Sequence, residues 1–305
     1  MKNNLPTRIQ GILLVLLATI FWSTSGILIN LIYQEIDIPA VSLAFWRDLS
    51  TFITLFLGIM IFRPKLLRIR RNDLPWLLAM GAISIGLFHV LWNITVVLLG
   101  ASIATVIQSN GPIFVTIMAW WVFGEALTSN KIIAVLLSVT GTILCSGIIS
   151  SGGHPVTPLG IILGVIGALA YGSFTLFGKK LAGNYSPWTI LFYVFAFATI
   201  ALLPLQFGKP IPWPIPPKVS GYFVSLILIS TITGFSLYTM GLNRLQASVA
   251  SITAMAEIVF AAILAYIILN ERLDFWQIFG AILVICGVIL VSFPNGKIAP
   301  VSSAS

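Results

Sequence analysis

Residues 101–127 read ASIATVIQSNGPIFVTIMAWWVFGEAL, and residues 247–273 read ASVASITAMAEIVFAAILAYIILNERL. When the chain is shifted by 146 positions the two segments align without a gap, and the register continues for 46 positions with 14 identities. Apolar composition raises the number of chance matches, but it does not explain the alignment of the polar Glu125 with Glu271. The chain therefore contains an internal duplication.

The composition is that of a chain that lies in lipid. Of the 305 residues, 58% are hydrophobic and 8% are charged, whereas a soluble domain carries about 25% charged residues. A transmembrane helix needs about 20 apolar residues, and ten stretches of the sequence meet this condition. They are residues 11–33, 39–62, 74–97, 101–123, 130–149, 159–179, 187–207, 219–241, 247–269 and 275–293.

Lysine and arginine are distributed unequally between the two faces that these helices define. With the N-terminus inside, twelve of the 16 lie on the inner side, three lie on the outer side, and Arg47 lies within a helix. Such residues accumulate on the cytoplasmic side, so both termini are predicted to be cytoplasmic. Because each copy holds five helices, an odd number, the second copy enters the membrane with the opposite orientation.

The predicted fold class is an all-α integral membrane protein with ten transmembrane helices, arranged as two inverted five-helix repeats. The repeats are assigned to residues 1–150 and 151–298, and a disordered tail is assigned to residues 299–305. Inverted repeats are typical of secondary transporters, whose substrate sites lie near the midplane between the halves. The predicted location is the cell (inner) membrane, with several passes through it.

The predicted partners are the lipid bilayer and a small-molecule substrate. The net charge of +8 does not indicate nucleic acid, because the basic residues lie in short loops between apolar stretches. Cys145 and Cys286 fall within predicted helices, which favours buried thiols over disulfides. We expect no metal or other cofactor, since no metal-binding or nucleotide-binding motif is present. The sequence leaves the choice between a monomer and a dimer open.

Several short motifs resemble the drug/metabolite transporter superfamily, specifically its EamA family of exporters. They are Phe21-Trp22-Ser23, Phe45-Trp46-Arg47, Gly111-Pro112, Gly124-Glu125-Ala126-Leu127, Asn270-Glu271-Arg272-Leu273 and the duplicated Ala-Ser-x-Ala quoted above. The resemblance covers about residues 8–293 and implies ten helices, cytoplasmic termini and export or exchange of amino acids, other metabolites or drugs. Two positions depart from the family pattern. Ser23 stands where the family often has glycine, and Ile258 stands where it often has proline, which puts a kink in the ninth helix in doubt.

Ionisable residues inside the membrane are the first candidates for a transport site, because their burial is costly. Glu257 lies near the predicted midplane and is a candidate for binding a substrate ammonium group or a proton. His89 and Asn93 share a helix face at a spacing of four residues, and His89 is the second candidate for proton coupling. Each of these residues has an alternative interpretation as an interhelical hydrogen-bonding group.

Arg47 matches a recurrent arginine of the family and is a candidate for binding a substrate carboxylate, with an interhelical ion pair as the structural alternative. Gln108 and Asn110 flank Gly111-Pro112, where proline removes a helical hydrogen bond and frees a carbonyl group for a site. A simple packing kink is the alternative interpretation there.

Aromatic and small polar residues complete the predicted cavity. Trp22 and Tyr171 occupy equivalent places in the two copies, Tyr238 matches Trp92 in the same way, and Ser25 lies close to Trp22 in sequence. Aromatic walls suit amphipathic substrates, although such residues also fill ordinary core positions. Glu125 and Glu271 are interpreted as structural, each complementing the N-terminus of the helix that follows it.

The sequence favours a secondary transporter that works by alternating access through a midplane cavity. An intramembrane enzyme lacks support, because no paired aspartates, no serine–histidine pair and no His-Glu-x-x-His motif appear. A purely structural accessory subunit does not need charges at midmembrane positions. Proton-coupled transport and facilitated exchange remain alternatives at this stage.

Overall fold

The computed structural model describes residues 7–99, 101–108, 110–146, 157–207, 214–269 and 274–293. These residues form helices and no β-strand, because within lipid a helix satisfies every backbone polar group inside one segment. The first half of the chain contains α1 (Thr7–Glu35), α2 (Ala40–Phe62), η1 (Pro64–Leu67), η2 (Arg71–Asp73), α3 (Leu74–Gly81), η3 (Ala82–Leu87), α4 (Phe88–Leu99), α5 (Ala101–Gln108), α6 (Gly111–Phe123) and α7 (Ser129–Cys145). The second half contains α8 (Pro158–Leu181), α9 (Pro187–Gln206), α10 (Pro217–Ser225), η4 (Leu226–Thr233), α11 (Gly234–Leu242), α12 (Ala247–Ala254), α13 (Ala256–Leu269) and α14 (Phe275–Ser292).

Nine helical segments of the described chain are long and apolar enough to cross a membrane. The remaining predicted span is α7, which has 17 residues and a length of about 26 Å at 1.5 Å per residue. The hydrocarbon core is about 30 Å thick, so α7 is slightly short, and residues 147–149 of its predicted range lie outside the described residues. Nine of the ten predicted spans are therefore found, and the tenth stays a prediction.

Both halves of the chain show the same two irregularities at matching places. Their third helical segments each contain a π-helical stretch, η3 in the first half and η4 in the second. Their fourth segments are each divided near the middle. The first division follows Gln108 and leads to Pro112 at the start of α6, and the second is a single residue, Met255, between α12 and α13. The ninth predicted span is thus interrupted at Met255, although Ile258 stands where the family often has proline.

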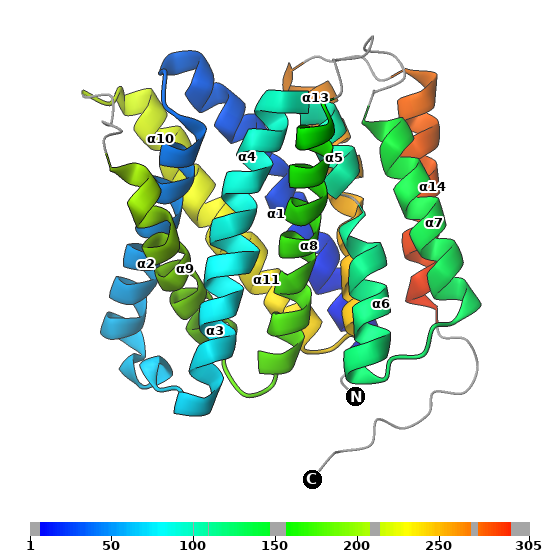
Figure 1. Ribbon diagram of the computed structural model, residues 1–305, viewed down its shortest axis with the longest axis horizontal. Helices are drawn as coiled ribbons and strands as arrows, with labels where there is room; N and C mark the ends of the chain where they lie inside the picture. Colours follow the sequence, from blue (N-terminus) through cyan, green and yellow to red (C-terminus); the bar gives the residue numbers. More distant parts are fainter. Residues whose placement is uncertain are drawn as a thin grey trace, which may run out of the picture.

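Helices of one half pack mainly against helices of the other half (Figure 1). In the first half α1 packs against α11 and α13, and in the second half its counterpart α8 packs against α4 and α6. The counterparts α2 and α9 pack against each other, as do α7 and α14. Each contact that a helix of the first half makes with the second half is thus matched by a contact that its counterpart makes with the first half.

The α7–α14 pair rests on glycines that allow close contact between backbones. A Cβ atom added to Gly141 would lie 2.6 Å from the carbonyl oxygen of Gly280, and one added to Gly287 would lie 2.8 Å from that of Ala134. Small residues at helix interfaces are the usual means of close packing in membranes. A shift of 146 positions converts the first contact into the second, so this interface follows the duplication.

The two ends of the described chain lie at the same end of the bundle (Figure 1). Arg8 near the start of α1 donates to the carbonyl oxygens of Val291 and Ser292 at the end of α14, at 2.7 and 3.2 Å. We call this end of the bundle the terminal face. The connection from α6 to α7 and that from α8 to α9 lie on the same face (Figure 1).

Candidate functional site

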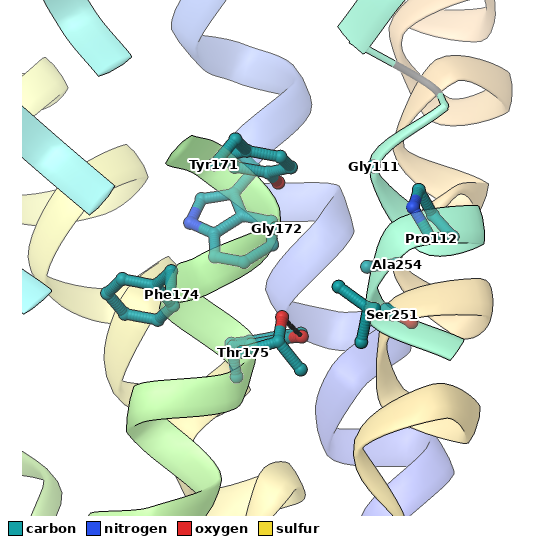
Figure 2. A pocket seen from close by; sticks show the side chains of 11 residues that line it. Gly111, Pro112, Tyr171, Gly172, Phe174, Thr175, Ser251 and Ala254 are labelled. Atoms are coloured by element: carbon teal, nitrogen blue, oxygen red, sulfur yellow. Dashed lines mark hydrogen bonds between the residues drawn. The ribbon is translucent and has the colours of Figure 1, made fainter. Parts of the chain in front are cut away.

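A small cavity lies in the centre of the bundle between both halves of the chain. Its volume is about 20 Å³, which is room for one water molecule. Figure 2 shows Tyr171, Phe174 and Thr175 of α8 on one side of it, with Pro112 of α6 and Ser251 of α12 on the other. Its other lining residues are Trp22, Gly111, Val115, Gly172, Tyr238 and Ala254. Three of the sequence-predicted site residues, Trp22, Tyr171 and Tyr238, therefore meet here.

Trp22 and Tyr238 form an aromatic wall of this cavity. The Trp22 ring packs against Phe235 and Tyr238 with ring centroids 5.0 and 4.9 Å apart, a spacing typical of favourable aromatic pairs. The hydroxyl of Tyr238 shares a hydrogen bond of 2.7 Å with that of Thr175. The indole Nε1 of Trp22 is buried and has no hydrogen-bond partner within the described part of the chain. An unpaired buried donor is costly, so this wall offers a hydrogen bond to a molecule that enters.

Arg47 is held by the π-helical stretch of the second half. Its Nε donates to Thr231 Oγ1 at 2.9 Å, and Thr231 in turn donates to the carbonyl of Leu226, five residues back, at 2.8 Å. A π-helix leaves such carbonyls available, and η4 therefore places the hydroxyl that orients Arg47. Within the described chain, the Arg47 side chain donates this one hydrogen bond, through Nε. Its two terminal nitrogens are therefore left for another group.

Glu257 lies in the first turn of α13, directly after the break at Met255. It is half-buried and forms no hydrogen bond or salt bridge with the described residues. Its carboxylate is within electrostatic range of Arg47 and of the Tyr171 hydroxyl, although no salt bridge within 4 Å joins Arg47 to Glu257 in the described chain. The acid and the base are thus close enough to interact but do not neutralise each other by direct contact.

His89 contacts a residue that the spacing argument did not pair with it. Its Nδ1 lies 3.2 Å from Asp48 Oδ2, so the partner comes from α2 and not from its own helix. The side chain of Asn93 is outside the described residues, and the predicted pair of His89 and Asn93 stays a prediction. Nothing in the sequence spacing identified Thr231 as the partner of Arg47 or Asp48 as the partner of His89.

Gln108, Asn110 and Ser25 are not among the lining residues of the central cavity. Gln108 lines a separate hollow of about 10 Å³ with Trp92 and Phe88, and its buried Oε1 has no hydrogen-bond partner in the described ranges. Asn110 is exposed and donates to the carbonyls of Val106 and Ile107 at 3.0 and 3.2 Å, so it closes the end of α5. Ser25 is half-buried and is not part of the cavity lining.

Glu125 has a different structural role from the one expected. The helix that follows it, α7, is capped by Thr128, whereas Glu125 reaches the N-terminus of α12 in the other half. Its carboxylate accepts from the backbone N–H groups of Ala247 at 2.6 Å and Ser248 at 3.3 Å, and also from the Ser248 hydroxyl. Lys131 Nζ forms a buried salt bridge with it at 3.3 Å. Glu271 lies outside the described residues.

These contacts close the cavity toward the terminal face. Val115 and Ala119 of α6 pack against Ala247 of α12, and residues 247–253 of α12 are buried throughout. Among the described residues, α6 and α12 of the two halves are therefore in direct contact on the side of the terminal face.

The sequence is similar to those of proteins named as transporters. A family profile described as the EamA-like transporter family matches residues 9–147 and again residues 158–293. An uncharacterized transporter of Archaeoglobus fulgidus is 28% identical over 73% of this chain and 79% of its own length. The uncharacterized inner membrane transporter YicL of Salmonella typhimurium is 24% identical over 94% and 97% of the two chains. The uncharacterized transporter YwfM of Bacillus subtilis is 25% identical over 96% and 95%.

A solved crystal structure shares the fold, with a TM-score of 0.78 and 16% sequence identity over 92% of this chain and 95% of the other. The relatives are named as transporters and not as enzymes, and the apolar helices make this a multi-pass membrane protein. Because the family profile matches nearly the whole chain, the resemblance inferred from the short motifs is confirmed, and the protein belongs to the EamA-like transporter family.

Proposed function

We propose that the protein is a secondary transporter that exports or exchanges small zwitterionic metabolites, amino acids above all, across the inner membrane. The observation that carries the proposal is the juxtaposition of Arg47 and Glu257, which interact electrostatically but form no salt bridge. A free amino acid carries one carboxylate and one ammonium group. Arg47 is suited to the carboxylate, because a guanidinium binds it with two parallel hydrogen bonds, and Glu257 is suited to the ammonium.

The side chain of the substrate would occupy the aromatic cavity, whose Tyr171 lies within electrostatic range of Glu257. Trp22, Tyr171 and Phe174 provide apolar surface there, and the hydroxyls of Thr175 and Ser251 provide a few polar contacts. Apolar walls with a small number of polar groups are typical of small-molecule sites. This lining favours amino acids with apolar or aromatic side chains over strongly hydrophilic ones.

Alternating access follows from the packing of the two halves. A cavity of about 20 Å³ is smaller than any amino acid, so the halves must separate for a substrate to bind. The exchange of contact roles between α1 and α8, and between α7 and α14, supports two five-helix repeats of opposite orientation. A structure closed at the terminal face would then have a counterpart closed at the other face. The excess of Lys and Arg on the side of the termini supports a cytoplasmic terminal face.

The test is exchange by the purified protein in liposomes loaded with unlabelled L-phenylalanine, with labelled L-phenylalanine outside. Glu257→Gln keeps the size of the side chain but removes its charge, and we expect the KM of exchange to rise about tenfold or more, since a charge-assisted hydrogen bond contributes about 1.5–3 kcal/mol. Arg47→Lys keeps the charge but loses the planar fork and should raise KM as well. The matched control is Glu35→Gln, because Glu35 forms an exposed salt bridge with Lys218. Wild-type KM in Glu257→Gln would overturn the assignment of the ammonium site.

A further inference from the structure

Asp48 and His89 form a buried pair that the cavity does not use. The His89 Nδ1 lies 3.2 Å from Asp48 Oδ2, the Asp48 side chain is fully buried, and that of His89 is 8% exposed. Neither residue lines the central cavity. The two side chains join α2 to α4, which places an acid and an imidazole inside the bundle but outside the cavity lining.

The pair is incomplete as a purely structural contact. The second carboxylate oxygen of Asp48, Oδ1, is buried and has no hydrogen-bond partner among the residues that the structure describes. Burial of an ionised carboxylate is unfavourable unless its oxygens are paired, and a packing contact would be expected to satisfy both. In a neutral imidazole one ring nitrogen donates and the other accepts. If Nδ1 donates to Asp48, then Nε2 is a free acceptor, and it forms no hydrogen bond with the described residues.

The elements packed around the pair contribute few other charges. Arg47 directly precedes Asp48 on α2, and its Nε donates to Thr231 of η4. Of the described side chains of α9, Tyr193 is the titratable one, and its hydroxyl donates to the carbonyl of Leu67 at 2.7 Å. The elements η3, η4 and α5 supply no titratable side chain. The short element η1, which packs against α2, supplies Lys65, which is exposed. The titratable residues of α8, which packs against α4, are Tyr171, Lys179 and Lys180, and Lys179 donates to the carbonyls of Leu242 and Leu245.

We propose that Asp48 and His89 form a proton-binding site that is separate from the central cavity and couples transport to a proton gradient. The proton adds to the free electron pair of His89 Nε2 and gives an imidazolium whose charge is balanced by the Asp48 carboxylate. Release of the same proton to water restores the starting state. Coupling would pass through α2, because Asp48 is adjacent to Arg47, and a substrate that draws Arg47 toward the cavity displaces Asp48 relative to α4. The coupling rests on the proposed function, whereas the proton site does not.

The proton site is tested first without any substrate. The chain has two histidines, so the variant His154→Gln leaves His89 as the one source of signal in a ¹⁵N-histidine NMR spectrum recorded in lipid vesicles. We expect the Nε2 signal to shift between pH 8 and pH 5 while Nδ1 keeps the shift of a protonated nitrogen. Asp48→Asn should remove that fixed Nδ1 protonation at pH 8. A His89 spectrum that does not respond to pH would overturn the proposal. This measurement leaves Asp48 and His89 themselves unsubstituted.

The coupling is tested by transport. We expect Asp48→Asn to retain exchange of labelled L-phenylalanine at equal pH on both sides but to lose accumulation driven by a pH gradient by at least tenfold. The control, His154→Gln, should retain both activities. Undiminished gradient-driven accumulation in Asp48→Asn would refute the coupling role. If the wild-type protein does not exchange L-phenylalanine at all, the proposed substrate class fails, while the NMR measurement still decides whether the proton site exists.

Discussion

At the scale of single residues, Gly234 sets the position of the aromatic wall. A Cβ atom added to it would lie 2.6 Å from Trp22 Cδ1 and 2.8 Å from Trp22 Nε1. We therefore expect Gly234→Ala to displace the Trp22 ring, to destabilise the protein by about 1–3 kcal/mol as overpacking usually does, and to reduce exchange of L-phenylalanine. Thermal unfolding in detergent and the liposome assay measure the two effects. Gly26→Ala, in the helix that carries Trp22, is the control, because its added Cβ has nothing within 4 Å. An unchanged Tm in Gly234→Ala would contradict this account.

The sequence allowed some of these residues to be predicted because their chemistry is visible without the fold. Glu257 and Arg47 stand out as charges within apolar stretches, and Trp22 and Tyr171 stand out through the duplication. The partners were hidden, because Thr231 and His89 come from helices that no spacing rule connects with α2. A pattern of 3.6 residues per turn predicts neighbours on one helix, whereas both hydrogen bonds cross between helices.

At the scale of elements, the N-terminus of α12 depends on a carboxylate from the other half of the chain. Glu125→Gln would leave Lys131 buried without its counterion, and breaking a buried pair in this way costs about 3–5 kcal/mol. We expect a clear fall in Tm, partly recovered in the double variant Glu125→Gln/Lys131→Met, in which no charge remains unpaired. Glu35→Gln removes the carboxylate of an exposed salt bridge and should leave Tm unchanged, as surface pairs contribute little. Equal Tm values for Glu125→Gln and Glu35→Gln would show that the cap is unimportant.

Helix positions were predictable from hydropathy, but their internal irregularities were only partly so. Gly111-Pro112 indicated the break before α6, since proline removes a helical hydrogen bond. No such residue marks the break at Met255, and it became visible only in the structure. The π-helical stretches η3 and η4 also lack a sequence signal, although η4 places the hydroxyl that holds Arg47. A π-helical turn holds more residues than an α-helical turn, so η3 rotates the faces of α4 relative to those of α3.

At the scale of the whole molecule, the two halves meet around a central cavity and also along a tightly packed margin. The cavity is lined by α1, α6, α8, α11 and α12, and neither α7 nor α14 contributes to it. The α7–α14 pair instead joins the last helices of the two halves through close backbone contact at Gly141 and Gly280. If the halves rock about the cavity, this pair is suited to holding them together while the contacts around the cavity change.

This division predicts that changes at the α7–α14 interface alter stability and leave substrate affinity unchanged. A Cβ on Gly280 would lie 2.5 Å from the backbone N of Cys145 and 2.5 Å from the carbonyl oxygen of Gly141. We therefore expect Gly280→Ala to lower Tm, while the KM for L-phenylalanine stays within about twofold of wild type, a difference of roughly 0.4 kcal/mol. Gly221→Ala in α10 is the control, because its Cβ would meet nothing within 4 Å. Gly141→Ala forces the same separation of the two helices, so the two substitutions together should destabilise by less than the sum of their separate effects. A large rise of KM in Gly280→Ala would mean that α7 and α14 take part in forming the substrate site.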